Sequence, residues 1–88
     1  MTEYFEVGKI LSPHGLKGEV KVNATTDFPE ERLATGSRLF IKNNKQYEKL
    51  IVENTRRHKQ FYLVKFEKID DIDQAEKICS KELYVAET

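Results

Sequence analysis

The chain lacks the cysteines of a disulfide framework, the apolar run of a membrane span and any net charge. Its 88 residues include one cysteine, Cys79, and no tryptophan. A single cysteine excludes an internal disulfide and a multi-cysteine metal site. No apolar run approaches the roughly 20 residues that a membrane-spanning helix needs. Fifteen basic and fifteen acidic side chains balance, so the chain lacks the overall positive charge of many nucleic-acid-binding domains.

These absences favour a reducing, cytoplasmic setting. The first residues do not form a basic stretch followed by an apolar one, so we expect no secretory leader. A chain of this length buries roughly 60–65% of the surface that its unfolded form exposes, which is enough for one small core. We therefore expect residues 1–88 to form a single domain that is monomeric when isolated.

The balanced net charge hides an uneven distribution. Up to Lys59 the chain carries eleven Lys and Arg against eight Asp and Glu, and from Gln60 onward it carries four against seven. The first part therefore has a net charge of +3 and the second part a net charge of −3. The only dense basic run, at residues 56–59, lies at the end of the positive part.

An apolar–polar alternation with a period of two predicts several short strands. They are expected at residues 4–11, 20–24, 38–42, 47–55 and 61–66, with a sixth around Leu83 and Val85. The alternation of the first breaks at Gly8, which predicts a bulge or tight bend. The buried face of the fourth strand stays open, and the fifth is apolar on both faces.

Two segments are predicted to be helical. Residues 27–33 form a short connecting turn of helix, with Pro29 suited to its first position and Asp27 as a cap. A second helix is indicated by apolar residues at helical spacing, namely Ile72, Ala75, Ile78 and Cys79.

The second helix has a recognisable start and sits among strands. Asp70 or Asp71 is expected as its N-cap, with Gln74 placed as in a capping box. Cys79, on the apolar face, is expected to be a small core residue. Six short strands, one helix before the last strand and no parallel crossover predict an all-β fold, a small antiparallel six-stranded barrel. Because the chain stops directly after the last strand, we expect it to be part of a longer protein.

The loop between the first two strands allows two interpretations. In one it is an ordinary connection in which Pro13 fixes φ, Gly15 and Gly18 take positive φ, and His14 bonds a nearby carbonyl. In the other it is a docking loop, because Leu16 and His14 cannot both be buried in so tight a turn. Lys17 beside them would then contact an acidic group or a phosphate.

The basic run also allows two interpretations. Residues 56–60 are expected to form a charged hairpin tip, whose cations either keep the sheet edge solvated or contact phosphates. Adjacent cations can neutralise several phosphates, and such contacts weaken with salt. The sequence does not decide between them, because the chain as a whole is not basic.

Little in the chain indicates catalysis or a bound metal. The two histidines lie in separate loops, and no G-x-S-x-G elbow is present to set up a nucleophile. The acidic residues at 70–73 lack the spacing of a calcium loop, and the dipole of the helix that follows explains them better. There is no phosphate-binding GxxxxGK motif. We expect no catalytic residues, no metal site and no cofactor.

Motifs spread over the whole chain resemble those of one known family. The most specific are Val7-Gly8-Lys9-Ile10 and His14-Gly15-Leu16-Lys17-Gly18-Glu19-Val20-Lys21-Val22. Supporting matches are Thr26-Asp27, Pro29-Glu30, Leu63-Val64-Lys65-Phe66-Glu67, Ile69-Asp70 and Glu82-Leu83-Tyr84-Val85. Together they resemble the N-terminal domain of the RimM family, the bacterial ribosome maturation factors.

The resemblance implies a barrel of the translation-factor type, followed in the full protein by a second, PRC-type barrel that is absent here. It implies a non-enzymatic role in late assembly of the small (30S) ribosomal subunit head, on which 16S rRNA processing depends indirectly. The implied partners are the free or immature small subunit, a ribosomal protein of its head and 16S rRNA. The candidate binding residues are His14, Gly15, Leu16 and Lys17, with Arg56, Arg57, His58 and Lys59.

Two functional hypotheses from different classes follow. In the first the domain is a docking module for the immature subunit. In the second it is a structural barrel that packs on its own C-terminal domain without contacting RNA, which an exposed apolar patch at Leu16 or on the outward face of residues 61–66 would favour. A third, a small hydrolase, would require that His14→Ala abolish a measurable turnover.

Overall fold

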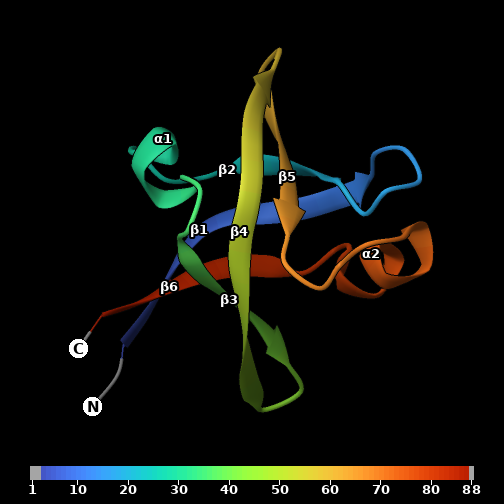
Figure 1. Ribbon diagram of the computed structural model, residues 1–88. Coiled ribbons are helices and arrows are strands. Elements are labelled where there is room, and N and C mark those ends of the chain that lie inside the picture. Colours follow the sequence, from blue (N-terminus) through green and yellow to red (C-terminus); the bar gives the residue numbers. More distant parts are fainter. Residues whose placement is uncertain (1–2, 88) are drawn as a thin grey trace.

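Antiparallel pairing closes the sheet of this protein into a barrel, as a computed structural model describing residues 3–87 shows (Figure 1). The strands are β1 (Glu3–Pro13), β2 (Val20–Ala24), β3 (Arg38–Asn43), β4 (Gln46–His58), β5 (Phe61–Phe66) and β6 (Glu82–Glu87). Around the barrel they follow the order β1-β2-β5-β4-β3-β6, and β6 pairs with β1. The predicted six-stranded antiparallel barrel is confirmed.

Strand β1 pairs with β2 on one side and β6 on the other, and its register with each neighbour shifts once. Its register with β6 shifts between Glu6 and Gly8, and its register with β2 shifts between Ile10 and Ser12. A Cβ at Gly8 would lie 2.9 Å from the carbonyl oxygen of Asn23, so a side chain does not fit there. The bend predicted at Gly8 is confirmed.

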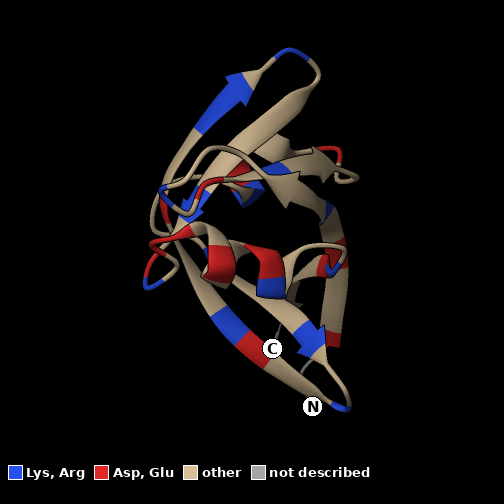
Figure 2. Ribbon diagram, turned by 90° about the vertical axis from the view of Figure 1, so that its right-hand side faces the viewer, with Lys and Arg blue, Asp and Glu red and all other residues tan. Residues whose placement is uncertain are grey.

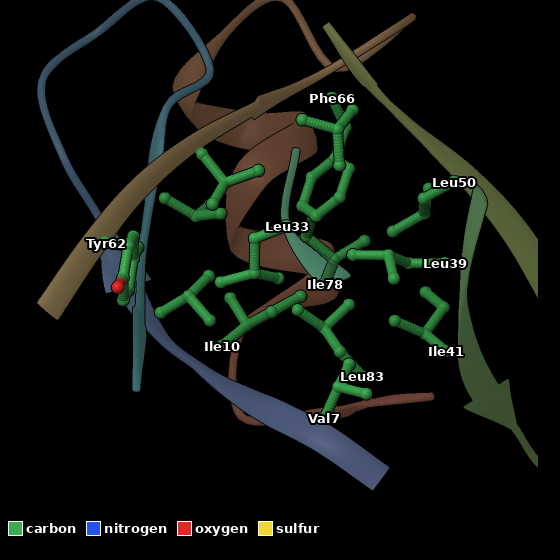
Figure 3. Close-up of a cluster of buried hydrophobic side chains, with 14 of the residues drawn as sticks. Val7, Ile10, Leu33, Leu39, Ile41, Leu50, Tyr62, Phe66, Ile78 and Leu83 are labelled. Atoms are coloured by element: carbon green, nitrogen blue, oxygen red, sulfur yellow. The ribbon is translucent and has the colours of Figure 1, made fainter. Parts of the chain in front are cut away.

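Apolar side chains from every strand, from helix α2 and from Leu33 fill the interior of the barrel (Figure 3). Leu50 and Val52 are both buried, which settles the inward face of β4. Strand β5 is apolar on both faces, as predicted. Tyr62, Val64 and Phe66 point into the core, and Leu63 on the opposite face is only 1% exposed.

Helix α1 (Pro29–Arg32) begins at Pro29, as expected, but its cap differs from the prediction. The N-cap residue is Phe28, and no side chain caps the helix. The backbone N–H of Phe28 instead donates to Oγ1 of Thr26 at 3.2 Å. The prediction that Asp27 caps α1 is therefore wrong, because the hydroxyl of Thr26 makes the local hydrogen bond of this turn.

Helix α2 (Ile72–Ile78) begins with the capping that the sequence predicts. Oδ1 of Asp71 accepts from the backbone N–H of Gln74 at 2.8 Å, and the Gln74 side chain accepts from the N–H of Asp70 at 2.7 Å. Cys79 is half-buried and packs against the core. Burial, with a smaller contribution from Glu76, raises the pKa of its thiol, which agrees with the expected packing role.

Candidate docking surface

The loop between β1 and β2 is fixed to the barrel at its root. The N–H of His14 donates to the carbonyl oxygen of Glu19 at 2.8 Å and closes the loop. Gly18 has a φ of 97° and is buried against the segment between β5 and α2. A Cβ at Gly18 would lie 2.1 Å from the carbonyl oxygen of Ile69. Only glycine satisfies both the conformation and the space.

The outer part of this loop, residues 14–17, points into solvent; we call it the docking loop. Gly15 has a φ of 76°, and no atom lies within 4 Å of where its Cβ would be. The positive φ values predicted for Gly15 and Gly18 are therefore confirmed. The side chains of His14 and Lys17 are exposed, and that of Leu16 is 75% exposed. The loop thus offers an apolar group, an imidazole and an ammonium on a fixed base.

The basic run does not form the hairpin tip that the sequence predicts. Strand β4 continues to His58, and only Lys59 and Gln60 make the turn, with Lys59 at a φ of 59°. The pairs across the two strands are Arg56 with Leu63, Arg57 with Tyr62 and His58 with Phe61. The prediction is wrong because the ladder with β5 extends three residues further than the apolar pattern indicates.

Strand pairing divides the basic run between two faces, because successive side chains of a strand point to opposite sides. Arg57 lies opposite Tyr62, whose hydroxyl donates to Oε1 of Glu30 in α1 at 3.2 Å. Burial, together with Glu30, raises the pKa of Tyr62, and the charge of Arg57 opposes this rise. The guanidinium of Arg57 also donates through Nε to the carbonyl oxygen of Lys59 at 3.2 Å. Arg57 therefore belongs to the α1 side of the hairpin.

Arg56 and His58 lie on the other face, where the tertiary structure brings them to the docking loop. The imidazole rings of His14 and His58 have centroids 5.8 Å apart and are tilted by 48°. Nη2 of Arg56 lies 3.6 Å from Oε1 of Glu19, at the root of the loop. We call the joined area, formed by residues 14–17 together with Arg56 and His58, the docking surface, and we group with it Lys59, the exposed turn residue that follows His58. The sequence placed its two halves in separate loops.

Further contacts support this surface from beneath. The Nζ of Lys21 in β2 lies 4.2 Å from the ring centroid of Phe61 in β5, a cation–π contact. Leu63 is buried between its register neighbours Lys21 and Arg56. Sequence reasoning missed the pairing of Lys21 with Phe61, because it depends on the register of β2 and β5.

Charge is distributed unevenly over the barrel. Figure 2 shows basic residues at the projecting end of the β4–β5 hairpin and acidic residues on α2. Lys65, between these regions, pairs with Glu53 and Asp70 at 2.9 Å each. Burial alone would lower the pKa of Lys65, but the hydrogen bonds with Asp70 and Glu53 outweigh it and raise that pKa.

The Arg56–Glu19 pair is exposed, and such pairs contribute about 0–1 kcal/mol, so Arg56 can exchange partners.

The arrangement suits binding to an anionic partner. It combines the cations of Lys17, Arg56 and Lys59 with two imidazoles and an exposed leucine, groups that contact phosphates and bases or an apolar side chain. Within residues 3–87, no three His, Cys, Asp or Glu side chains are grouped to hold a metal ion. Neither described helix is long and apolar enough to cross a membrane.

Solved structures share this fold. A crystal structure of a 16S ribosomal RNA processing protein RimM from Pseudomonas aeruginosa matches with a TM-score of 0.83 at 25% identity, over 94% of this chain and 50% of that chain. The solution structure of the N-terminal domain of RimM from Thermus thermophilus matches with a TM-score of 0.74 at 18% identity, over 93% of this chain and 87% of that chain, and shows likeness of fold alone.

Sequence relatives carry the same family name. The chain is 99% identical to the ribosome maturation factor RimM of Lactobacillus johnsonii and 86% identical to that of Lactobacillus gasseri, in both cases over its whole length and 51% of the relative. It thus spans about half the length of these curated relatives. The family model described as RimM N-terminal domain matches residues 5–88. The chain therefore belongs to the RimM family of ribosome maturation factors, within which it corresponds to the N-terminal domain.

Proposed function

We propose that this barrel is the non-catalytic docking module of a cytoplasmic ribosome maturation factor. It binds the immature small (30S) ribosomal subunit, assists late assembly of the subunit head and thereby supports 16S rRNA processing. The observation that carries the proposal is the approach of the His14 and His58 rings to 5.8 Å. This approach joins two cationic segments, distant in sequence, into one surface. The names of the relatives, ribosome maturation factor and 16S ribosomal RNA processing protein, support a ribosomal partner.

The proposed contacts are few and of two kinds. Lys17, Arg56 and Lys59 contact phosphates of the 16S rRNA, and the planar guanidinium of Arg56 binds two phosphate oxygens at once. Leu16, which is 75% exposed, serves as the apolar anchor against a ribosomal protein of the head. A surface with so few contacts binds weakly by itself, and linkage to a second domain would raise the overall affinity.

The division of the basic run provides the sharpest test of this proposal. In the full-length protein, Arg56→Ala removes a cation from the docking surface, whereas Arg57→Ala removes the same charge from the α1 side. We expect Arg56→Ala to lower the slope of log affinity against log salt by about 1 and Arg57→Ala to leave it nearly unchanged. Binding to immature small subunits is measured at several salt concentrations.

The combined variant Lys17→Ala, Arg56→Ala and Lys59→Ala extends this test to the whole docking surface. The control variant replaces Lys42, Lys45 and Lys49 with Ala, which gives the same change in charge. These lysines are exposed in and near the β3–β4 hairpin, outside the docking surface. Equal effects of the two triple variants would show that only net charge matters, and the docking surface would then lose its role.

The alternative function is a barrel that packs on its own C-terminal domain and never contacts RNA. The exposure of Leu16 favours that hypothesis, but Leu63 on the outward face of β5 is buried. A photo-crosslinker at residue 16 in assembling subunits separates the two. Crosslinks to ribosomal protein or 16S rRNA support the docking module, and crosslinks confined to the same polypeptide chain support the alternative.

A further inference from the structure

A second candidate surface lies at the other end of β1, where a groove of about 430 Å³ opens beside α1. Its apolar lining residues are Phe5, Val7, Phe28 and Val85, and its polar ones are Glu6, Thr25, Thr26, Asp27 and Arg32. Phe5 and the docking loop lie near opposite ends of the same strand, roughly 25 Å apart at about 3.3 Å per residue. The groove is therefore separate from the docking surface.

The groove exposes apolar area that the barrel itself does not use. Phe5 is 47% exposed and Phe28 is 60% exposed. With Leu16, they are the large hydrophobic residues that the described part of the chain leaves exposed. Val7 and Val85 at the floor are buried members of the core, so the interior continues outward into the groove. Two exposed aromatic side chains beside a groove make it a candidate interaction site.

Phe28 has no evident role in stabilising the helix that it precedes. It occupies the N-cap position of α1, where a short side chain with an oxygen acceptor is favoured. Helix α1 itself buries none of its residues. Phe28 therefore adds exposed apolar surface at a position where Ser, Thr, Asp or Asn would cap α1 better.

The wall of the groove is held in place before anything binds. The N–H groups of Thr25 and Thr26 both donate to the carbonyl oxygen of Val7, at 2.9 and 3.2 Å. Oγ1 of Thr25 donates to Oε2 of Glu6 at 3.1 Å. A preformed groove loses less conformational entropy on binding than a flexible one.

The course of β6 indicates what fills the groove. In the register with β1, Phe5 lies opposite Val85 and Glu3 lies opposite Glu87. Figure 1 shows this end of β6 on the side of the barrel that carries α1, away from α2. The curated relatives are about twice as long as this chain, which matches their N-terminal domain. In the full-length protein the next segment therefore leaves the barrel beside the groove.

We propose that the groove between Phe5 and Phe28 seats an apolar side chain from the segment that follows residue 88. This contact fixes the second half of the full-length protein against the barrel. A tethered segment is present at a millimolar effective concentration, so a contact too weak to form between separate molecules is still populated. The proposal is independent of the ribosomal function, because it concerns the opposite end of β1.

Photo-crosslinking in the full-length protein tests the occupant directly. The photoreactive p-benzoylphenylalanine replaces Phe28 in one variant and Leu16, the matched exposed control, in another. We expect crosslinks within one polypeptide, to residues after 88, from position 28 and not from position 16. Crosslinks between two copies would overturn the proposal in favour of self-association. Absence of crosslinks at position 28, or equal crosslinks from both positions, would also overturn it.

Small-angle X-ray scattering gives a second, independent readout. Phe5→Ser with Phe28→Ser removes the apolar walls, and since both side chains are exposed the barrel keeps its fold. We expect the radius of gyration of the full-length protein to increase in this double variant and to stay unchanged in Leu16→Ser. An unchanged scattering curve for the double variant, with the barrel folded by circular dichroism, would contradict the proposed contact.

Discussion

The two ends of strand β1 carry surfaces of opposite character. At the Pro13 end the docking loop, which exposes Leu16 together with His14 and Lys17, projects into solvent beside Arg56 and His58, and its root packs against the barrel. At the Glu3 end the apolar core continues outward into the groove between Phe5 and Phe28. The first surface depends on charge held away from the core, and the second depends on core-like area left uncovered. A small barrel can therefore serve two partners without overlap between them.

The largest effect is expected from breaking the support of the docking end. Gly18→Ala places a Cβ against the carbonyl oxygen of Ile69 at a φ of 97°, so it should destabilise the protein by about 3 kcal/mol or more. Gly15→Ala is the control, because its φ is also positive but its surroundings are open, and it should cost about 1 kcal/mol. Urea unfolding measures both. Equal losses for the two variants would show that the root of the loop is not fixed by packing.

A smaller effect is expected beside α1, where the Tyr62–Glu30 hydrogen bond connects α1 to β5. Tyr62→Phe should lower the free energy of unfolding by about 1 kcal/mol at neutral pH. Glu30→Gln keeps an acceptor for the Tyr62 hydroxyl and should cost less. Equal losses of unfolding free energy in the two variants would show that the Tyr62–Glu30 hydrogen bond does not hold α1 against β5.

The raised pKa of Tyr62 predicts that the stability of the fold depends on pH in the alkaline range. The pKa of Tyr62 is raised in the folded protein by burial and by Glu30, so the unfolded chain loses this proton first, near pH 10. Folding stability contributed by Tyr62 is therefore complete below about pH 10 and decreases as the pH rises further. The decrease in stability should be less steep in Tyr62→Phe. It should not disappear, because the pKa values of Lys65 and Tyr84 are also raised in the folded protein. Unfolding measured from pH 7 to 11 checks the sign.

The smallest effect on stability is expected at Phe28 itself. Phe28→Ser removes an exposed side chain and supplies a favourable N-cap for α1, so the barrel should change by less than about 0.5 kcal/mol, or become slightly more stable. Hydrogen exchange of the β4 and β5 amides in the full-length protein measures the barrel alone. A loss of protection in these strands would show that Phe28 supports the fold, which would remove the contrast between the two ends of β1.

Most of the fold follows from local patterns in the sequence. The alternation of apolar residues located all six strands, Gly8 marked the bend in β1, and Asp71 with Gln74 marked the start of α2. The predicted end of β4 was too early, because pairing with β5 extends this strand through Arg57 and His58, whose side chains have no apolar pattern. The cap of α1 was misassigned because Asp27 and Thr26 both have suitable oxygens, and only the path of the chain selects one.

The candidate docking surface was predictable only in its parts. The docking loop and the basic run each stood out in the sequence, but nothing there indicated that His14 and His58 meet, or that Arg57 turns away from Arg56. The groove was not foreseen, because Phe5 resembles any other residue of an apolar strand.

The sequence by itself determined the family, the strand pattern and the unequal distribution of charge, since these depend on residue types and short spacings. The tertiary structure alone decided which charges act together. The order of the strands sets β2 beside β5 and β5 beside β4, and the register of these pairs places residues from two distant segments on one face. The physical reason is that side-chain direction in a strand alternates with every residue, so a neighbour in sequence can lie on the opposite side of the sheet.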